Sequence, residues 1–256
     1  MAHKLHYLAS IALFGVLANS PAVSQEDVQP RPPQTAQVES GWRMLFDGKT
    51  LNGWRSYGKP APAEVWSVKN GHIVLEPFKW WPTNVTKRGA LMTVDQFTNF
   101  ELELEWKVSR RANSGLMFGV REVEGARFAH QSGIEIQILD NVNSNVAKKP
   151  SHRASAIFDQ LPPPVDSTKP VGEFNKVRLR VMNGKVTHTL NGAEMASFDT
   201  RSQEWLDTVA NSSFKNSKFY GKYETGHIVL QDHLNQVEFR NIRIRELPNE
   251  TSFTDN

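Results

Sequence analysis

Two runs of the chain each carry a pair of glutamate, glutamine or histidine residues two positions apart. The run GIEIQIL presents Glu135 and Gln137 opposite three isoleucines, and the run HIVLQDH presents Gln231 and His233 in one alternation. Successive side chains of a strand point to opposite faces, so each pair shares a face. Carboxyl, amide and imidazole groups bind hydroxyl groups in defined geometry, and carboxyl and imidazole groups also transfer protons. These residues predict a ligand site on one sheet face. For Glu135 and Gln137 alone, a solvated face is the alternative.

Histidine and tryptophan residues extend the candidate set. The alternation of residues 185–190 places His188 on an outward strand face. Four tryptophans in loop-like or strand-edge contexts could stack on sugar faces: Trp54, Trp66, Trp80 and Trp81. Packing in the core or at its rim is the alternative for each of them.

The composition excludes several kinds of chemistry. The 256 residues contain no cysteine, which rules out disulfides, cysteine-ligated zinc, iron–sulfur clusters and thiol nucleophiles. Lysine and arginine number 30 against 27 aspartate and glutamate, and this net charge of +3 predicts no polyanionic partner. No nucleic-acid partner is expected either, because the later strands carry arginines singly, without interleaved exposed aromatic residues. These are Arg178, Arg180, Arg240, Arg243 and Arg245.

The chain divides into four segments. Residues 1–24 resemble a secretory signal peptide, with a short basic start, an apolar run of 11 residues and a small-x-small cleavage motif that ends at Ser24. The apolar run is too short to span a membrane, which takes about 20 residues. We expect residues 25–40 to be a Pro-rich flexible arm, 41–247 a β-sandwich domain and 248–256 a C-terminal tail. We expect export to a bacterial periplasm, without a membrane span.

Alternating apolar and polar residues predict many short strands. They recur in residues 100–108, 133–139, 176–182, 226–232 and 237–245. Asn-Gly pairs at 183–184 and 191–192 predict tight hairpin turns. Residues 203–209 could form one short helix, and no longer window has a helical period. The pattern predicts an all-β fold, an antiparallel two-sheet sandwich or jelly roll.

A series of motifs follows one order along residues 41–247. They are LFDGKTLNGW from Leu45, WSVKNG from Trp66, FELELEWK from Phe100, NSG from Asn113, GIEIQILDN from Gly133, PVGEFN from Pro170, HTLNG from His188, GHIVLQDH from Gly226 and VEFRNIRIR from Val237. Together they resemble the 3-keto-disaccharide hydrolase domain family. Departures are Phe174 in place of a tryptophan, ASAIF at 154–158 in place of AGALY, and Leu234 in place of a glycine.

The resemblance implies a jelly-roll sandwich of the concanavalin A-like lectin and glucanase type, with a sugar site on its concave sheet. It also implies action on glycosides oxidised at C3. A ketone at C3 acidifies the C2 proton, so a base can remove this proton, the enolate expels the C1 aglycone, and water can add for net hydrolysis. Glu135 and His233 are both candidates for the base.

The remaining predicted site residues bind or enclose the substrate. Amide groups would orient hydroxyls, and the long loop with His152 could close over the site. The candidate contacts are Asn113, Gln137, Gln231, His152, His188 and Asp140. Asp140 and Asp232 fall on the strand face opposite to that of Glu135. Their alternative role is therefore structural, as carboxylates of a turn or of the core edge. A divalent metal held by Glu, Asp and His is a candidate cofactor, although no spacing such as H-E-x-x-H occurs.

Two other functions remain open at this point. A two-carboxylate glycoside hydrolase on this fold would carry E-x-D-x-x-E, whereas this strand has Glu135, Gln137 and Asp140 at those positions. Glu101, Glu103 and Glu105 have the two-residue spacing but could be merely solvated. A non-catalytic carbohydrate-binding module would need stacking aromatics and hydroxyl binders, without a tuned base.

Overall fold

The computed structural model describes residues 41–77 and 87–248, which fold into two antiparallel sheets. The strands are β1 (Trp42–Met44), β2 (Trp54–Ser56), β3 (Trp66–Lys69), β4 (His72–Leu75), β5 (Leu91–Thr93), β6 (Phe100–Val108), β7 (Asn113–Val120), β8 (Ile134–Leu139), β9 (Asn175–Met182), β10 (Lys185–Leu190), β11 (Ala193–Asp199), β12 (His227–Leu230) and β13 (Val237–Glu246). Short helices are η2 (Ala129–Gln131), η3 (Asn145–Lys148), η4 (Pro150–His152) and α1 (Gln203–Ala210). The prediction of one short helix near residue 203 is confirmed.

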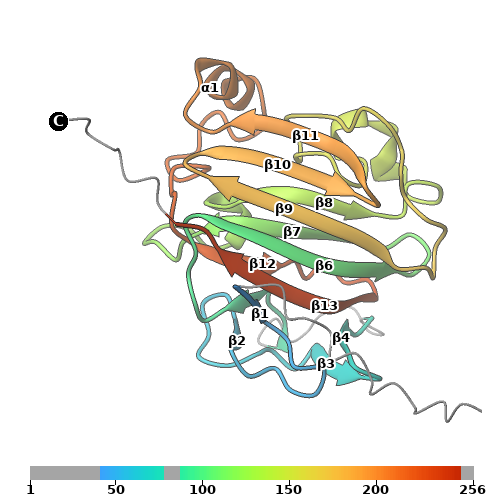
Figure 1. Cartoon of the computed structure of the whole chain (residues 1–256). Helices are drawn as coiled ribbons and strands as arrows, with labels where there is room; N and C mark the ends of the chain where they lie inside the picture. Colours follow the sequence, from blue (N-terminus) through green and yellow to red (C-terminus); the bar gives the residue numbers. More distant parts are fainter. Residues whose placement is uncertain (1–40, 78–86, 249–256) are drawn as a thin grey trace, which may run out of the picture. The chain divides into compact units, whose positions relative to one another are not determined.

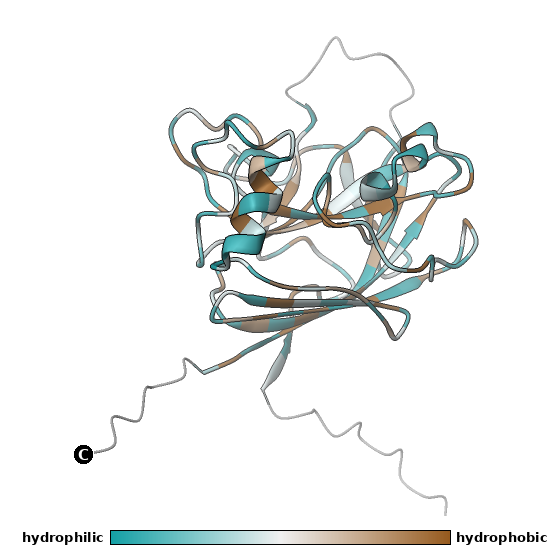
Figure 2. Ribbon diagram, turned by 90° about the horizontal axis from the view of Figure 1, so that it is seen from above, coloured by the Kyte–Doolittle hydropathy of each residue, from teal (hydrophilic) through white to brown (hydrophobic). Residues whose placement is uncertain are grey.

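The two sheets lie face to face (Figure 1). The eight-stranded sheet has the order β11-β10-β9-β6-β13-β4-β3, with β1 paired to β13, and the five-stranded sheet has the order β2-β5-β12-β7-β8. In the view from above, the eight-stranded sheet forms one layer, and the five-stranded sheet with its loops forms the other (Figure 2). This is an all-β, antiparallel jelly-roll sandwich, as the sequence predicts.

Apolar residues at alternate positions of the strands form the core between the two sheets. The isoleucines of β8 and the Leu116 and Phe118 side chains of β7 belong to one buried cluster with inward residues of β6, β9 and β13. The turns predicted from Asn-Gly pairs are also confirmed. Asn183 and Gly184, and likewise Asn191 and Gly192, have positive φ angles between antiparallel strands, as tight hairpin turns require.

Two tryptophans proposed for sugar stacking belong to this core. Trp54 and Trp66 are both buried, and their Nε1 atoms donate to the carbonyls of Leu45 and Gly89 at 2.7 Å each. Their indole faces therefore pack inside the protein. Trp80 and Trp81 lie outside the described residues.

His188 also faces inward, which corrects the expectation of an outward position. It shares the alternation of Val186 and Leu190, and all three side chains are buried between the sheets. Burial lowers the pKa of His188 to about 4, so the ring is neutral.

The outer face of the eight-stranded sheet carries a ladder of ion pairs. Glu101, Glu103 and Glu105 on β6 each lie between a cation of β9 and an arginine of β13. The side chains of Glu101 and Glu103 are only 7% and 9% exposed, so they are not solvated. The arginines that stand singly along each strand are thus paired across strands. Within the described residues, no helix is long and apolar enough to cross a membrane.

Candidate functional site

The outer face of the five-stranded sheet gathers most of the predicted site residues. In the β7–β8 register, Met117 lies opposite Glu135 and Gly115 lies opposite Gln137. Gln231 directly follows β12, and its backbone N–H donates to the Gly115 carbonyl at 2.8 Å. Because the isoleucines of β8 point into the core, Glu135 and Gln137 must point to the opposite face.

Glu135 is a buried carboxyl group, and no cationic side chain pairs with it within the described residues. Its side chain is almost wholly removed from solvent, and Oε1 accepts a hydrogen bond from Gln231 Nε2 at 2.9 Å. Burial raises the pKa of Glu135 to about 8, and the hydrogen bond from Gln231 only partly offsets this. The carboxyl group therefore titrates close to neutral pH, as a catalytic base or acid must.

Gly115 provides the room for this carboxyl group. A Cβ atom at position 115 would collide with Glu135 Oε1 and would lie 2.8 Å from its Cδ. The side chain of Glu135 therefore lies across β7, over Gly115, and reaches Gln231 on the far side. A glycine within a strand often marks such a close approach, so the NSG motif contained this signal.

Two polar atoms beside Glu135 have no partner within the described part of the chain. Gln137 Nε2 and Asn113 Oδ1 are both buried and form no hydrogen bond there. One is a donor and the other an acceptor. Buried polar groups are nearly always paired in native proteins, so such a pair on one face indicates a place for a polar ligand.

β8 is the last strand of its sheet, and a loop segment from residue 151 to residue 161 runs along its outer edge. Ser155 N–H donates to the Gln137 carbonyl at 2.8 Å, and Phe158 N–H donates to the Glu135 carbonyl at 2.9 Å. The His152 ring stacks on Phe158 with 4.4 Å between centroids, and Nε2 lies 3.0 Å from Asp159 Oδ1. The loop thus holds His152 beside the strand that carries Glu135.

An aromatic group that the sequence analysis missed continues from this loop. Phe214 lies edge-on to Phe158 and stacks on Tyr220, with 4.0 Å between the latter two centroids. Tyr220 donates from its hydroxyl to Gln160 Oε1 at 2.7 Å. Burial and the nearby charge of Glu135 raise the pKa of Tyr220, so this hydroxyl remains a neutral donor.

Two predicted residues lie in different surroundings. His233 is exposed in the segment after β12, and no hydrogen bond or ion pair to its ring is found within residues 41–77 and 87–248. Asp140 is buried and accepts the backbone N–H groups of Arg111, Val142 and Asn143 at 2.8 to 3.1 Å. Its carboxylate is thereby committed to the turn after β8, which is the structural role that its alternation indicates.

Asp232 is likewise structural, because it pairs with Arg88 and accepts the Gly89 N–H at 3.1 Å. These contacts tie the segment before β5 to the end of β12, next to Gln231. In the described ranges, no group of three or more His, Cys, Asp or Glu side chains could hold a metal ion.

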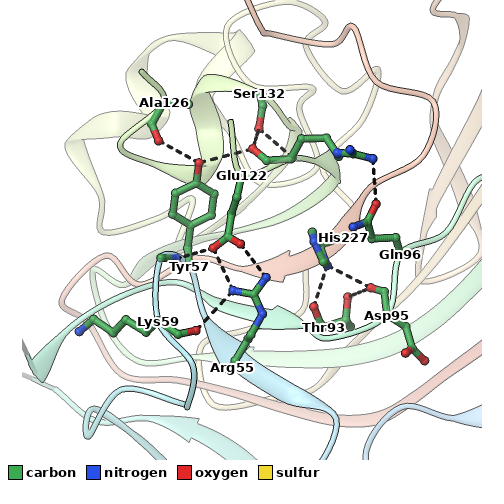
Figure 3. Close-up of polar contacts among 12 residues, drawn as sticks. Arg55, Tyr57, Lys59, Thr93, Asp95, Gln96, Glu122, Ala126, Ser132 and His227 are labelled. Atoms are coloured by element: carbon green, nitrogen blue, oxygen red, sulfur yellow. Dashed lines mark hydrogen bonds and ion pairs between the residues drawn. The ribbon is translucent and has the colours of Figure 1, made fainter. Parts of the chain in front are cut away.

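A second polar cluster surrounds Arg55 and Glu122, where β2 meets the loop after β7 (Figure 3). Arg55 on β2 forms a bidentate pair with Glu122, with contacts of 2.9 and 2.7 Å. Tyr57 donates to the Ala126 carbonyl, and His227 Nδ1 lies 2.8 Å from the Thr93 carbonyl. Because these charged groups satisfy one another, the cluster fastens the loop after β7 to the sheet edge.

Fold and site together define a jelly-roll sandwich with a buried, titratable carboxyl group on the outer face of its smaller sheet. The model of a family described as the 3-keto-alpha-glucoside-1,2-lyase-like domain matches residues 41–245. A "3-keto-disaccharide hydrolase" of Bacteroides thetaiotaomicron is 34% identical over 228 residues, which cover 81% of this chain and 79% of the relative. The chain belongs to this family.

Solved structures agree with this assignment. A "putative glycosyl hydrolase" from Parabacteroides distasonis superposes with a TM-score of 0.72 at 26% identity, covering 81% of this chain and 94% of the other. A second protein described in the same words, from the same organism, gives a TM-score of 0.63 at 25% identity, with 80% and 99% covered.

Proposed function

We propose that this protein is a hydrolytic enzyme that cleaves 3-keto-disaccharides and related 3-keto-glycosides at the outer face of its five-stranded sheet. Family membership and the relative named 3-keto-disaccharide hydrolase support the substrate class. The observation that carries the proposal is the buried Glu135 carboxyl group, with a pKa raised to about 8, beside Gln137 Nε2 and Asn113 Oδ1, which have no partner within the described residues. It combines a tuned proton acceptor with groups that bind a polar ligand.

In the first step, the Glu135 carboxylate removes the C2 proton of the bound sugar. The C–H electron pair forms a C2–C3 double bond, and the carbonyl pair moves to the C3 oxygen, which gives an enolate. A carboxylate whose pKa is about 8 is a stronger base than an ordinary glutamate of pKa 4.5. The exposed His233 lies in no comparable environment, so the base role falls to Glu135.

Gln137 Nε2 is a donor suited to the enolate oxygen at C3, and Asn113 Oδ1 accepts from a sugar hydroxyl. Such preorganised donors stabilise charge that develops in the transition state. In the second step, the enolate carbonyl re-forms, a C1–C2 double bond forms, and the C1–oxygen bond breaks. The leaving oxygen takes up a proton. Addition of water, with hydroxyl to C1 and a proton to C2, completes hydrolysis.

The test is incubation with a 3-keto-disaccharide, followed by NMR. We expect a free 3-keto sugar or the 2-hydroxy-3-keto-glucal intermediate, and a loss of at least about a thousandfold in kcat for Glu135→Gln. Glu194→Gln, an exposed glutamate of β11 on the other sheet, is the matched control and should retain full activity.

Other outcomes point to the other functions. Near-normal turnover by Glu135→Gln would contradict the assignment of the base. Rapid cleavage of the unoxidised disaccharide would instead favour a two-carboxylate glycoside hydrolase, and binding without turnover would favour a carbohydrate-binding module.

A further inference from the structure

Two exposed aromatic rings belong to the η2 turn, which leads into β8, the strand of Glu135. Phe128 is 60% exposed, and its ring is nearly parallel to that of His130, with 5.5 Å between centroids and 9° between planes. A large apolar ring that contributes so little to the core is available to a ligand. Flat aromatic surfaces pack against apolar faces of ligands, and a pyranose presents such a face in its C–H groups.

The chain places these rings directly before the strand that carries Glu135. Gly133 N–H donates to the Ala129 carbonyl at 3.0 Å, so η2 folds back at the start of β8. A Cβ atom on Gly133 would collide with Val120, so this close return needs glycine. Ala129 then joins Met117 in a buried cluster, and Met117 is the cross-strand partner of Glu135. The η2 turn, which carries the aromatic pair, thus packs against β7 on the side of Glu135 away from Gln137.

The pair is held in place by its own loop. Gln131 Oε1 accepts the backbone N–H groups of Arg127 and Phe128 at 2.6 and 2.9 Å. The Gln131 carbonyl accepts a hydrogen bond from Ser217 Oγ at 3.1 Å, which ties the loop to its neighbour. A surface fixed in this way loses little conformational entropy when a ligand binds.

We propose that Phe128 and His130 form the subsite for the leaving group, a pyranose unit attached to C1 of the oxidised sugar. The inference rests on the proposed function. C2 lies between C3 and C1 in the sugar ring, and Glu135 lies between Gln137 and the aromatic pair along the outer face. With Glu135 at C2 and Gln137 at the C3 oxygen, C1 and its substituent extend toward Phe128.

The test compares two substrates, a 3-keto-disaccharide and methyl 3-keto-glucoside, whose leaving group is methanol. Phe128→Ala should raise KM about tenfold for the disaccharide and leave KM unchanged for the methyl glycoside. Phe128→Trp should keep the wild-type KM, whereas Phe128→Leu, which is apolar but has no ring, should behave like the alanine variant. Met44→Ala is the matched control, because Met44 is 56% exposed on the other sheet.

An unchanged KM for the disaccharide in Phe128→Ala, or an equal rise for both substrates, would overturn the subsite. Turnover of the methyl glycoside by the wild type tests the proposed function separately. If the wild type cleaves neither substrate, NMR titration with the unoxidised disaccharide decides the subsite. Weaker binding by Phe128→Ala than by Met44→Ala supports it, and equal binding overturns it.

Discussion

At the scale of single residues, environment rather than residue type distinguishes the glutamates of this protein. Glu135 is buried beside an amide, and burial raises its pKa to about 8. Burial would also raise the pKa of Glu101, but hydrogen bonds and charges from Arg245 and Arg178 outweigh it and lower the pKa. The first carboxyl group is suited to proton transfer, and the second is locked as an anion.

The pH dependence of turnover follows from the raised pKa of Glu135. A base acts in its ionised form, so kcat/KM should rise about tenfold per pH unit below pH 8 and level off above it. A pH–rate profile on methyl 3-keto-glucoside measures this. A profile that falls above pH 8 would show instead that the protonated carboxyl group is the active form.

Ionisation of Glu135 should also lower the free energy of unfolding as the pH rises. The pKa of Glu135 is higher in the folded protein than its ordinary value of 4.5, so its contribution to folding is retained below pH 4.5 and lost as pH rises toward 8. Glu135→Gln cannot ionise. Its free energy of unfolding should therefore exceed that of the wild type by a margin that grows by about 1 kcal/mol per pH unit over this range. Urea unfolding between pH 5 and pH 8 checks this; a constant margin would contradict the burial of an ionisable group.

At the scale of elements, the β7–β8 register creates the site by placing Gly115 where Glu135 must cross. Gly115 has no positive φ angle, so alanine fits the backbone there, and the three atoms nearest to its Cβ would all belong to the Glu135 side chain. The site therefore depends on a missing side chain as much as on those present.

Gly115→Ala should displace the carboxyl group and lower kcat/KM about a hundredfold, because misplacement by about 1 Å has effects of this size. We also expect a stability loss of about 1–3 kcal/mol from overpacking. Repeating the substitution in Glu135→Ala removes the clash, so the stability loss should largely disappear. An equal loss in both backgrounds, by urea unfolding, would show that the clash is not its cause.

In the eight-stranded sheet, the ion pairs of Glu101, Glu103 and Glu105 contribute to stability. Glu101 contacts Arg178 at 3.0 Å and also pairs with Arg245, while the flanking arginines stay a third to a half exposed. Solvent therefore screens part of the interaction, which reduces its contribution below that of a fully buried pair.

Glu101→Gln should lower the free energy of unfolding by about 2 kcal/mol at pH 7, with Glu194→Gln near zero as the exposed control. Because the folded pKa of Glu101 is lowered, this contribution is present above pH 4.5 and is lost as pH falls through the folded value. The free energies of unfolding of Glu101→Gln and Glu194→Gln should therefore become equal in acid. Enzymatic activity should be unaffected in both variants.

At the scale of the whole molecule, the sequence predicts an exported chain, and we propose that maturation removes residues 1–24. The exported protein would begin at Gln25 with 232 residues, and the loss of Lys4 would reduce the net charge from +3 to +2. Intact-mass analysis of the protein recovered from a bacterial periplasm checks the new terminus. A protein that keeps residues 1–24 would contradict the proposal.

The sequence by itself determined the sheet architecture and much of the candidate site. Strict alternation in β8 fixed the shared face of Glu135 and Gln137, because strand side chains repeat every two residues. Asn-Gly pairs fixed two turns, because their residues tolerate the positive φ angles that hairpins need. The position of His188 was also encoded, since it alternates with Val186 and Leu190, although an outward face was expected.

Tertiary structure decided which of these residues share one environment. Alternation assigns a residue to a face but does not say what covers that face, so it could not separate Glu135 from the Glu101–Glu105 series. That difference arises from β9 and β13, which bring arginines to one set, and from β7, where Gly115 admits the other carboxyl group. Likewise Tyr220 and Gln160 reach the surroundings of Glu135 from loops outside the strand that carries it. Charge state follows from burial and partners, and these exist only once the strands have paired.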